Sequence, residues 1–139
     1  MSRHQVAVEF HRVEPLVPYW LEGLPEGPVV ADTPRGRQLG WIRATQPLGQ
    51  KPFPPCQAAR TEDLRQHQQR KLFAAEVLAW SRRRTEELQL ALQLESAYQV
   101  LDGELLVLHF SAEERVDFRP LVKALAQQYR KKIERFQLK

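Results

Sequence analysis

The sequence predicts an α+β protein. Short N-terminal antiparallel strands form a small curled sheet or barrel, and a long connecting helix then leads to a β-β-α-β unit whose helix packs on its sheet. Three observations predict this fold. Short apolar runs lie between prolines and polar turns near the N-terminus, and a long run without glycine or proline follows residue 60. After that run, the sequence shows the patterns of two strands, an amphipathic helix and a further strand. The expected domains are an N-terminal β subdomain (1–46), a proline-rich linker (47–60) and an α-β-β-α-β subdomain (61–139).

The N-terminal strands are predicted from alternation and from turn residues. Residues 4–13 alternate between apolar and polar side chains, which is typical of a half-buried strand. An edge strand is expected around residues 19–21, because prolines lie on either side of it. Residues 29–31 and 38–45 are expected to pair, since the polar turn DTPRG separates them. Short strands with closely spaced turns favour a small curled sheet or barrel.

The long helix is predicted to follow the proline-rich linker. Residues 46–60 contain four of the ten prolines and show no regular period. Thr61 and Asp63 then begin a run that is expected to stay helical to about Leu88. At about 1.5 Å per residue this helix is roughly 40 Å long, which exceeds the width of a small domain.

The apolar residues of this helix lie on two nearly opposite sides. One row contains Phe73, Val77, Trp80 and Leu88, and the other contains Leu64, Ala75 and Leu78. A helix that is apolar on two sides contacts two layers of its own chain, or one layer and another molecule such as a partner helix or a second copy. Both alternatives are open at the level of sequence. If the first row is exposed, Phe73, Val77 and Trp80 are the expected anchors for a protein partner.

The C-terminal unit is predicted from a hairpin and an amphipathic helix. Strands over residues 90–101 and 104–111 are expected to join at Asp102-Gly103 through a type I′ turn. Asp117 is expected to cap the next helix by accepting a hydrogen bond from a first-turn N–H. The apolar stripe of that helix contains Phe118, Leu121, Val122, Leu125 and Tyr129. A short strand over residues 133–138 is expected to follow.

Two groups of residues carry a family resemblance. In the C-terminal half, the pattern DG-x-x-L-x-x-x-F-(x)5-VDFR-x-LV-x-x-LA is filled by Asp102, Gly103, Leu106, Phe110 and the segment 116–126, which includes Asp117, Phe118 and Arg119. In the N-terminal half, V-x-V-x-F is filled by Val6, Val8 and Phe10, and T-x-R-G-x-x-L-G is filled by Thr33, Arg35, Gly36, Leu39 and Gly40. Together these residues resemble the polymerase-suppressor C-terminal domain family, which includes the YaaT-like (RicT-like) stage-zero sporulation proteins of bacteria.

The resemblance implies a cytoplasmic adaptor or regulatory protein that acts through protein–protein complexes and is not an enzyme. YaaT-like members assemble with small helical proteins and influence RNA processing, phosphorelay signalling and development. A link to RNA processing or replication is therefore expected, with helical proteins or a second copy as partners. The motif residues are expected to have structural roles.

No cofactor is expected. YaaT-like relatives carry a cysteine-bearing tail that is associated with iron–sulfur clusters, whereas the single cysteine of this sequence, Cys56, lies in another region. The four histidines, His4, His11, His67 and His109, show no paired spacing for a metal. The serines at 81, 96 and 111 lack the flanking glycines of a nucleophile elbow. We therefore expect no metal site and no catalytic residues.

The composition fits a soluble globular protein, with 42% hydrophobic and 27% charged residues. No apolar run approaches the roughly 20 residues that span a bilayer. The N-terminal residues MSRHQVAVEF enter a strand-like pattern, so that no secretory signal is expected. A cytoplasmic location without membrane contact follows as an expectation.

Nucleic-acid binding is the alternative function. The net charge is +4, and basic residues gather on the long helix and at the C-terminus. The candidate contact residues are Arg60, Lys71, Arg82, Lys131 and Lys132. No stacking aromatic residues lie between these charges, so the known single-strand platforms are not matched.

Overall fold

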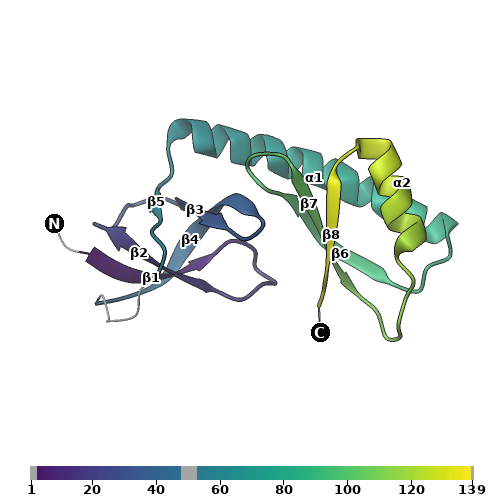
Figure 1. The fold of residues 1–139 in the computed structure, drawn as a ribbon, viewed down its shortest axis with the longest axis horizontal. Helices are drawn as coiled ribbons and strands as arrows, with labels where there is room; N and C mark the ends of the chain where they lie inside the picture. Colours follow the sequence, from purple (N-terminus) through teal and green to yellow (C-terminus); the bar gives the residue numbers. More distant parts are fainter. Residues whose placement is uncertain (1–2, 48–52, 139) are drawn as a thin grey trace. The chain divides into compact units, whose positions relative to one another are not determined.

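A computed structural model describes residues 3–47 and 53–138 of the chain. It forms two compact units, Met1–His67 and Gln68–Lys139, and the boundary between them falls within the long helix α1 (Thr61–Glu87). The predicted α+β fold is confirmed, with a curled N-terminal sheet, the long helix and a β-β-α-β unit in that order (Figure 1).

The N-terminal unit contains one antiparallel sheet of five strands. The strands are β1 (Arg3–Glu9), β2 (Val17–Glu22), β3 (Val29–Thr33), β4 (Gly36–Pro47) and β5 (Gln57–Ala58). Their order in the sheet is β2-β1-β4-β3-β5, and the predicted pairing of β3 with β4 is confirmed.

The segment around Cys56 connects the two edges of this curled sheet, β2 and β3. The backbone N–H of Cys56 donates to the carbonyl of Trp20 on β2 at 2.9 Å, while β5 pairs with β3. The segment from residue 53 onward, which lies inside the predicted linker, is therefore hydrogen-bonded to the N-terminal sheet. Residues 48–52 of that linker lie outside the described residues.

The curled sheet encloses a small core. Its buried members are Val6, Val8, Tyr19, Leu21, Val29, Ala31 and Cys56. Burial raises the pKa of the Cys56 thiol to about 11, so that the thiol stays protonated and unreactive at neutral pH.

Gly40 allows β4 to lie against β1. A Cβ atom at this position would come within 2.6 Å of Val8 Cγ1 and 2.8 Å of the Glu9 carbonyl oxygen. The register of β1 and β4 also shifts nearby, between Ala7 and Val8. Only glycine fits this approach without moving backbone, which gives the Gly40 of the family pattern a structural role.

The C-terminal unit contains a three-stranded sheet covered by helices. Its strands are β6 (Gln93–Gln99), β7 (Leu105–Ser111) and β8 (Lys132–Gln137), in the order β6-β7-β8. The helix α2 (Arg119–Tyr129) connects β7 to β8, which run parallel, whereas β6 and β7 are antiparallel.

One apolar cluster joins the helices of this unit to its sheet. The fully or nearly buried members are Val77 from α1, Leu94 from β6, Leu106, Leu108 and Phe110 from β7, Phe118, and Leu121 and Leu125 from α2. The predicted stripe of α2 therefore faces the sheet, as expected from its spacing.

One local prediction is wrong and a second is confirmed only in its hydrogen bond. The hairpin forms at Asp102-Gly103, but Gly103 N–H donates to the Val100 carbonyl and Gly103 alone of the turn has positive φ, at 81°. A type I′ turn requires positive φ at both central residues, so the predicted turn type is wrong. The residue at the cap position of α2 is Phe118, although Asp117 Oδ1 does accept the Arg119 backbone N–H at 3.1 Å.

Candidate functional surfaces

The predicted anchor row of α1 is internal. Val77 is completely buried in the apolar cluster of the C-terminal unit. The rings of Phe73 and Trp80 pack edge-on against Tyr129 of α2, with centroids 5.5 and 5.6 Å apart. The condition for a role as partner anchors, exposure of this row, is therefore not met. Apolar residues on this side of α1 stabilise the fold.

The opposite side of α1 carries an exposed apolar stripe. We define the α1 stripe as Leu64, Leu72, Ala75 and Ala79, all of which are exposed. At about 100° per residue these side chains fall within about 80° of one another. Leu64 is 44% exposed. Leu72 is 64% exposed, which makes it the most exposed large apolar residue among the described residues. Leu78, assigned to this row from sequence, packs instead against the apolar cluster.

Arg82, a candidate nucleic-acid contact, donates its hydrogen bonds to the backbone of a strand at the edge of the sheet. Its Nε and Nη2 atoms donate to the Leu94 carbonyl at 3.0 and 2.8 Å, and Nη2 also lies 3.3 Å from the Glu95 carbonyl. Both carbonyls belong to β6, an edge strand with a register shift at this point. Arg82 therefore satisfies backbone groups that a sheet edge leaves unpaired.

The other candidate basic residues lie in separate places. Arg60 precedes α1 in the N-terminal unit, and its backbone N–H donates to Asp63 Oδ2 at 2.8 Å, which supports the helix start. Lys71 is exposed on α1, and Lys131 and Lys132 lie at the start of β8. Within the described residues, Lys71, Lys131 and Lys132 make no ion pair.

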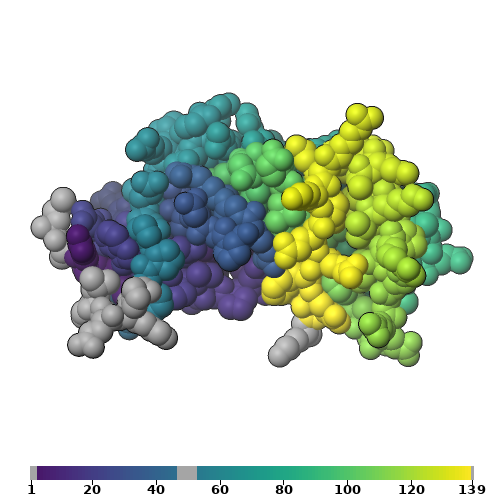
Figure 2. Space-filling model, viewed as in Figure 1, coloured from purple at the N-terminus to yellow at the C-terminus, as the bar shows by residue number. Residues whose placement is uncertain are grey.

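The α2–β8 segment forms a second candidate surface. We define the α2–β8 basic surface as Lys123, Arg130, Lys131 and Lys132. Lys123, Arg130 and Lys132 are exposed and Lys131 is half-buried. Figure 2 shows this yellow-green segment at the surface of the C-terminal unit.

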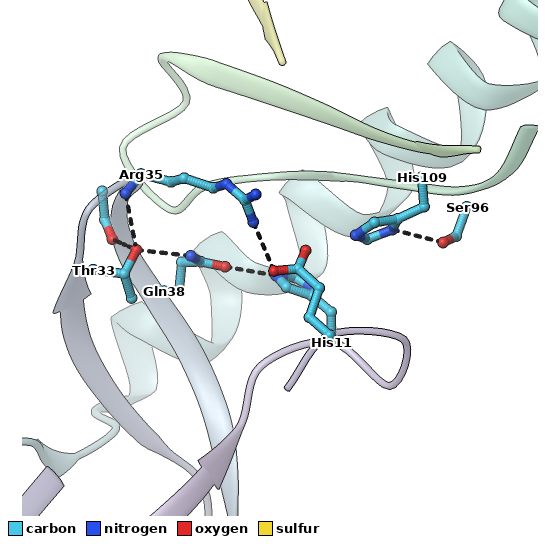
Figure 3. A network of polar contacts seen from close by, with 8 residues as sticks. His11, Thr33, Arg35, Gln38, Ser96 and His109 are labelled. Atoms are coloured by element: carbon cyan, nitrogen blue, oxygen red, sulfur yellow. Dashed lines mark hydrogen bonds and ion pairs between the residues drawn. The ribbon is translucent and has the colours of Figure 1, made fainter. Parts of the chain in front are cut away.

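Ser96 and His109 form a contact that the sequence analysis missed. Ser96 Oγ lies 2.8 Å from His109 Nδ1 on neighbouring strands (Figure 3). The sequence could have predicted this contact, because Ser96 and His109 are equally far from the Asp102-Gly103 turn and a regular hairpin register places such residues opposite each other. His109 is only 1% exposed, with the rings of Tyr98 and Phe136 against it. A nucleophile must reach substrate, and therefore this pair is better explained as a structural contact.

The N-terminal motif residues form a polar network at the β3–β4 turn. Thr33 Oγ1 accepts from Gln38 Nε2 at 2.8 Å and donates to the Gly36 carbonyl at 2.7 Å (Figure 3). Arg35 Nη1 donates to Glu14 Oε1 at 2.6 Å in a half-buried ion pair. The φ of Gly36 is 129°, a conformation that favours glycine. The network stabilises the turn.

The C-terminal motif residues also have structural contacts. Arg70 on α1 donates to the Leu101 carbonyl at 3.0 Å, and its guanidinium lies 3.3 Å from where a Cβ of Gly103 would be. Asp117 pairs with Arg119, and the hydrogen bond from the Arg119 side chain is the main cause that lowers the pKa of the Asp117 carboxyl. These residues hold the hairpin against α1 and fix the start of α2.

A depression lies beside the C-terminal part of α1. It is lined by Arg82, Thr85, Glu86, Leu90, Leu92, Gln93, Leu94 and Glu95, with a volume of about 340 Å³. The Arg82 guanidinium in it is already bound to backbone carbonyls. Across residues 3–47 and 53–138, no group of three or more His, Cys, Asp or Glu residues is placed to hold a metal ion.

The helices of the structure do not have the length and apolar character needed to cross a membrane, as far as the described residues extend.

Comparison with known proteins identifies the family. The family model described as the PSP1 C-terminal conserved region matches residues 56–138, which is more than half of the chain. The comparison with curated proteins and the comparison with solved structures gave no match. The matched segment contains α1, the C-terminal pattern of residues 102–126 and the whole β-β-α-β unit. The chain thus belongs to the PSP1 C-terminal conserved region family, and the family resemblance of its sequence is confirmed.

Proposed function

We propose that this protein is a non-enzymatic cytoplasmic adaptor that binds an amphipathic helix of another protein along the α1 stripe. The observation that carries the proposal is the solvent exposure of Leu64, Leu72, Ala75 and Ala79 on a helix whose Val77 side is packed in the apolar cluster of the C-terminal unit. Exposed apolar residues that gather on one side of a helix are typical of interaction surfaces.

A helix is the partner that fits this stripe. Ala75 and Ala79 are one turn apart, and small side chains at that spacing let a second helix approach closely. The leucines on the N-terminal side of the alanines supply apolar area for packing into the groove between turns. Charged residues border the stripe, including Arg65, Glu76 and Arg83, and would form the polar rim of such an interface.

The absence of enzymatic activity is part of the proposal. It is supported by the contacts of the polar residues described above, which bind backbone carbonyls, turns or one another. A setting in RNA processing or replication is likewise proposed, on the family resemblance.

The test uses a single labelled cysteine. Because the Cys56 thiol is buried with a raised pKa, a Leu72→Cys variant can be labelled selectively with a photocrosslinker at neutral pH. Labelled protein incubated in extract of the native organism, with nuclease and at moderate salt, is expected to crosslink to a helical segment of a partner. Leu24→Cys is the matched control, since Leu24 is 51% exposed but lies outside α1, between β2 and β3.

The partner found in this way is then purified and its affinity measured. Leu72→Asp is expected to weaken binding by tenfold or more, about 1.4 kcal/mol, while Leu24→Asp leaves it unchanged. Equal binding by wild type and a folded Leu72→Asp variant would contradict the proposal, as would crosslinking only to a second copy of this chain.

A further inference from the structure

The positive charge of this protein is concentrated in its last segment. Seven lysine and arginine residues and a single acidic residue, Glu134, lie in residues 118–139, giving that segment a charge of +6. Residues 1–117 hold fourteen basic and sixteen acidic residues and carry −2. The basic character of the chain is therefore a property of α2 and β8, and not of the chain as a whole.

The fold presents this charge on one continuous segment. Leu121 and Leu125 are completely buried, which turns Lys123 on the opposite side of α2 toward solvent. Arg130 ends α2 in a left-handed conformation with φ of 54°, and its N–H donates to the Ala126 carbonyl. The chain turns there, so that Lys131 and Lys132 follow directly at the start of β8.

These cations are not neutralised by their neighbours. Lys123, Arg130, Lys131 and Lys132 form no ion pair with any residue in the described ranges. Elsewhere exposed arginines do pair, as Arg65 does with Glu62 and Arg84 with Glu87. The dipole of α2 favours a cation at its last turn, which accounts for Arg130 but not for Lys123 in the middle of the helix or Lys132 on a strand.

We propose that the α2–β8 basic surface binds the phosphate backbone of duplex nucleic acid. Four unpaired cations on a convex helix and the adjoining turn complement a row of phosphates. No large apolar side chain of α2 or β8 is exposed, as far as the described residues go, and so the surface offers neither a platform on which unstacked bases bind nor an apolar wedge that enters a lipid bilayer. Contact is therefore independent of base sequence.

The test is a salt titration of binding. Fluorescence anisotropy is measured with DNA and RNA duplexes of about two helical turns, a single strand of the same length, and vesicles containing phosphatidylserine, over about 50 to 200 mM salt. Duplex affinity is expected to fall with a slope of log K against log salt of about −3 to −4, because four phosphate contacts each contribute about −0.9.

Matched variants assign the contact to the surface. Lys123→Gln/Arg130→Gln/Lys132→Gln is expected to lower the slope by about 3 and to reduce duplex affinity at low salt by 100-fold or more. The control Lys71→Gln/Arg83→Gln/Arg115→Gln, which removes the same charge from exposed positions outside α2 and β8, is expected to lose much less. Circular dichroism and urea unfolding confirm that both variants are folded.

Several outcomes would overturn the inference. Equal losses of duplex affinity in the two triple variants would do so, as would an affinity that does not change with salt. So would single strands that bind as tightly as duplexes, or binding to vesicles without binding to duplexes. Since Leu72→Asp lies outside this surface, it should bind duplexes as the wild type does. Partner binding of Leu72→Asp therefore tests the adaptor proposal alone, and duplex binding of the Lys123/Arg130/Lys132 variant tests this proposal alone.

Discussion

The two sides of α1 are both apolar, yet they have opposite environments. Val77 has no exposed surface, and Phe73 and Trp80 pack on Tyr129. Leu72, one residue before Phe73 in the chain, is 64% exposed. The difference teaches that apolar spacing on a helix does not by itself tell which side is buried, because burial depends on what the rest of the fold packs against that side.

The largest expected effect separates the two sides by stability. Val77→Asp places an unpaired charge in the apolar cluster and should lower the free energy of unfolding by about 4 kcal/mol or more. Leu72→Asp places the same charge in solvent and should change it by less than about 0.5 kcal/mol. Urea unfolding monitored by tryptophan fluorescence measures both. Similar losses in the two variants would mean that both sides of α1 are packed within the chain.

An intermediate effect distinguishes Arg82 from its neighbour Arg83. Removing the Arg82 side chain leaves the Leu94 and Glu95 carbonyls without their donor and should cost about 1 to 2 kcal/mol. Arg83→Ala, on the exposed side, should stay within about 0.5 kcal/mol. Urea unfolding gives the two values, and amide exchange of β6 should accelerate only in Arg82→Ala. Unchanged exchange in that variant would show that Arg82 does not stabilise the strand edge.

The smallest effect concerns an ion pair on the exposed first turn of α1. Arg65 donates to the Glu62 carboxylate at 2.9 Å, and this hydrogen bond is the main cause that lowers the pKa of Glu62. Because the pKa is lower in the folded state, the pair stabilises the fold above the ordinary glutamate pKa of about 4.3 and this stabilisation is lost as the pH falls through the folded-state value.

The carboxyl carbon shift of Glu62 followed by NMR during acid titration measures that pKa. Arg65→Gln is expected to raise it toward the ordinary value and to leave stability at pH 7 nearly unchanged, since exposed pairs contribute little. An unchanged Glu62 pKa in the variant would rule out the pair as the cause of the shift.

Much of the C-terminal unit could be predicted because its patterns are local. The period of Phe118, Leu121 and Leu125 identified α2 and its buried side, and the Asp102-Gly103 dipeptide located the hairpin. The Ser96–His109 contact was also within reach, since hairpin register follows from the position of the turn. The turn type was predicted wrongly, because Asp-Gly favours a type I′ turn whereas Asp102 does not adopt the positive φ that this turn requires.

The N-terminal closure could not be predicted in the same way. The backbone N–H of Cys56 donates a hydrogen bond to the carbonyl of Trp20, 36 residues earlier in the chain. A backbone hydrogen bond does not depend on which side chains the two residues carry, and so no periodic pattern in the sequence indicates it. The close approach at Gly40 depends likewise on where β1 lies. Arg82 was assigned to nucleic acid because a charged side chain shows its chemistry in the sequence but not the carbonyls that it meets.

The sequence by itself determined the α+β order of the main elements, the spacing of side chains around each helix, and the excess of positive charge after residue 117. Only the tertiary structure decided that the Val77 side of α1 is internal and the Leu72 side is free, and that Arg82 is occupied while Lys123 and Lys132 are not. The physical reason is that spacing along a helix fixes side chains relative to one another, whereas burial and pairing depend on atoms contributed by distant segments of the chain.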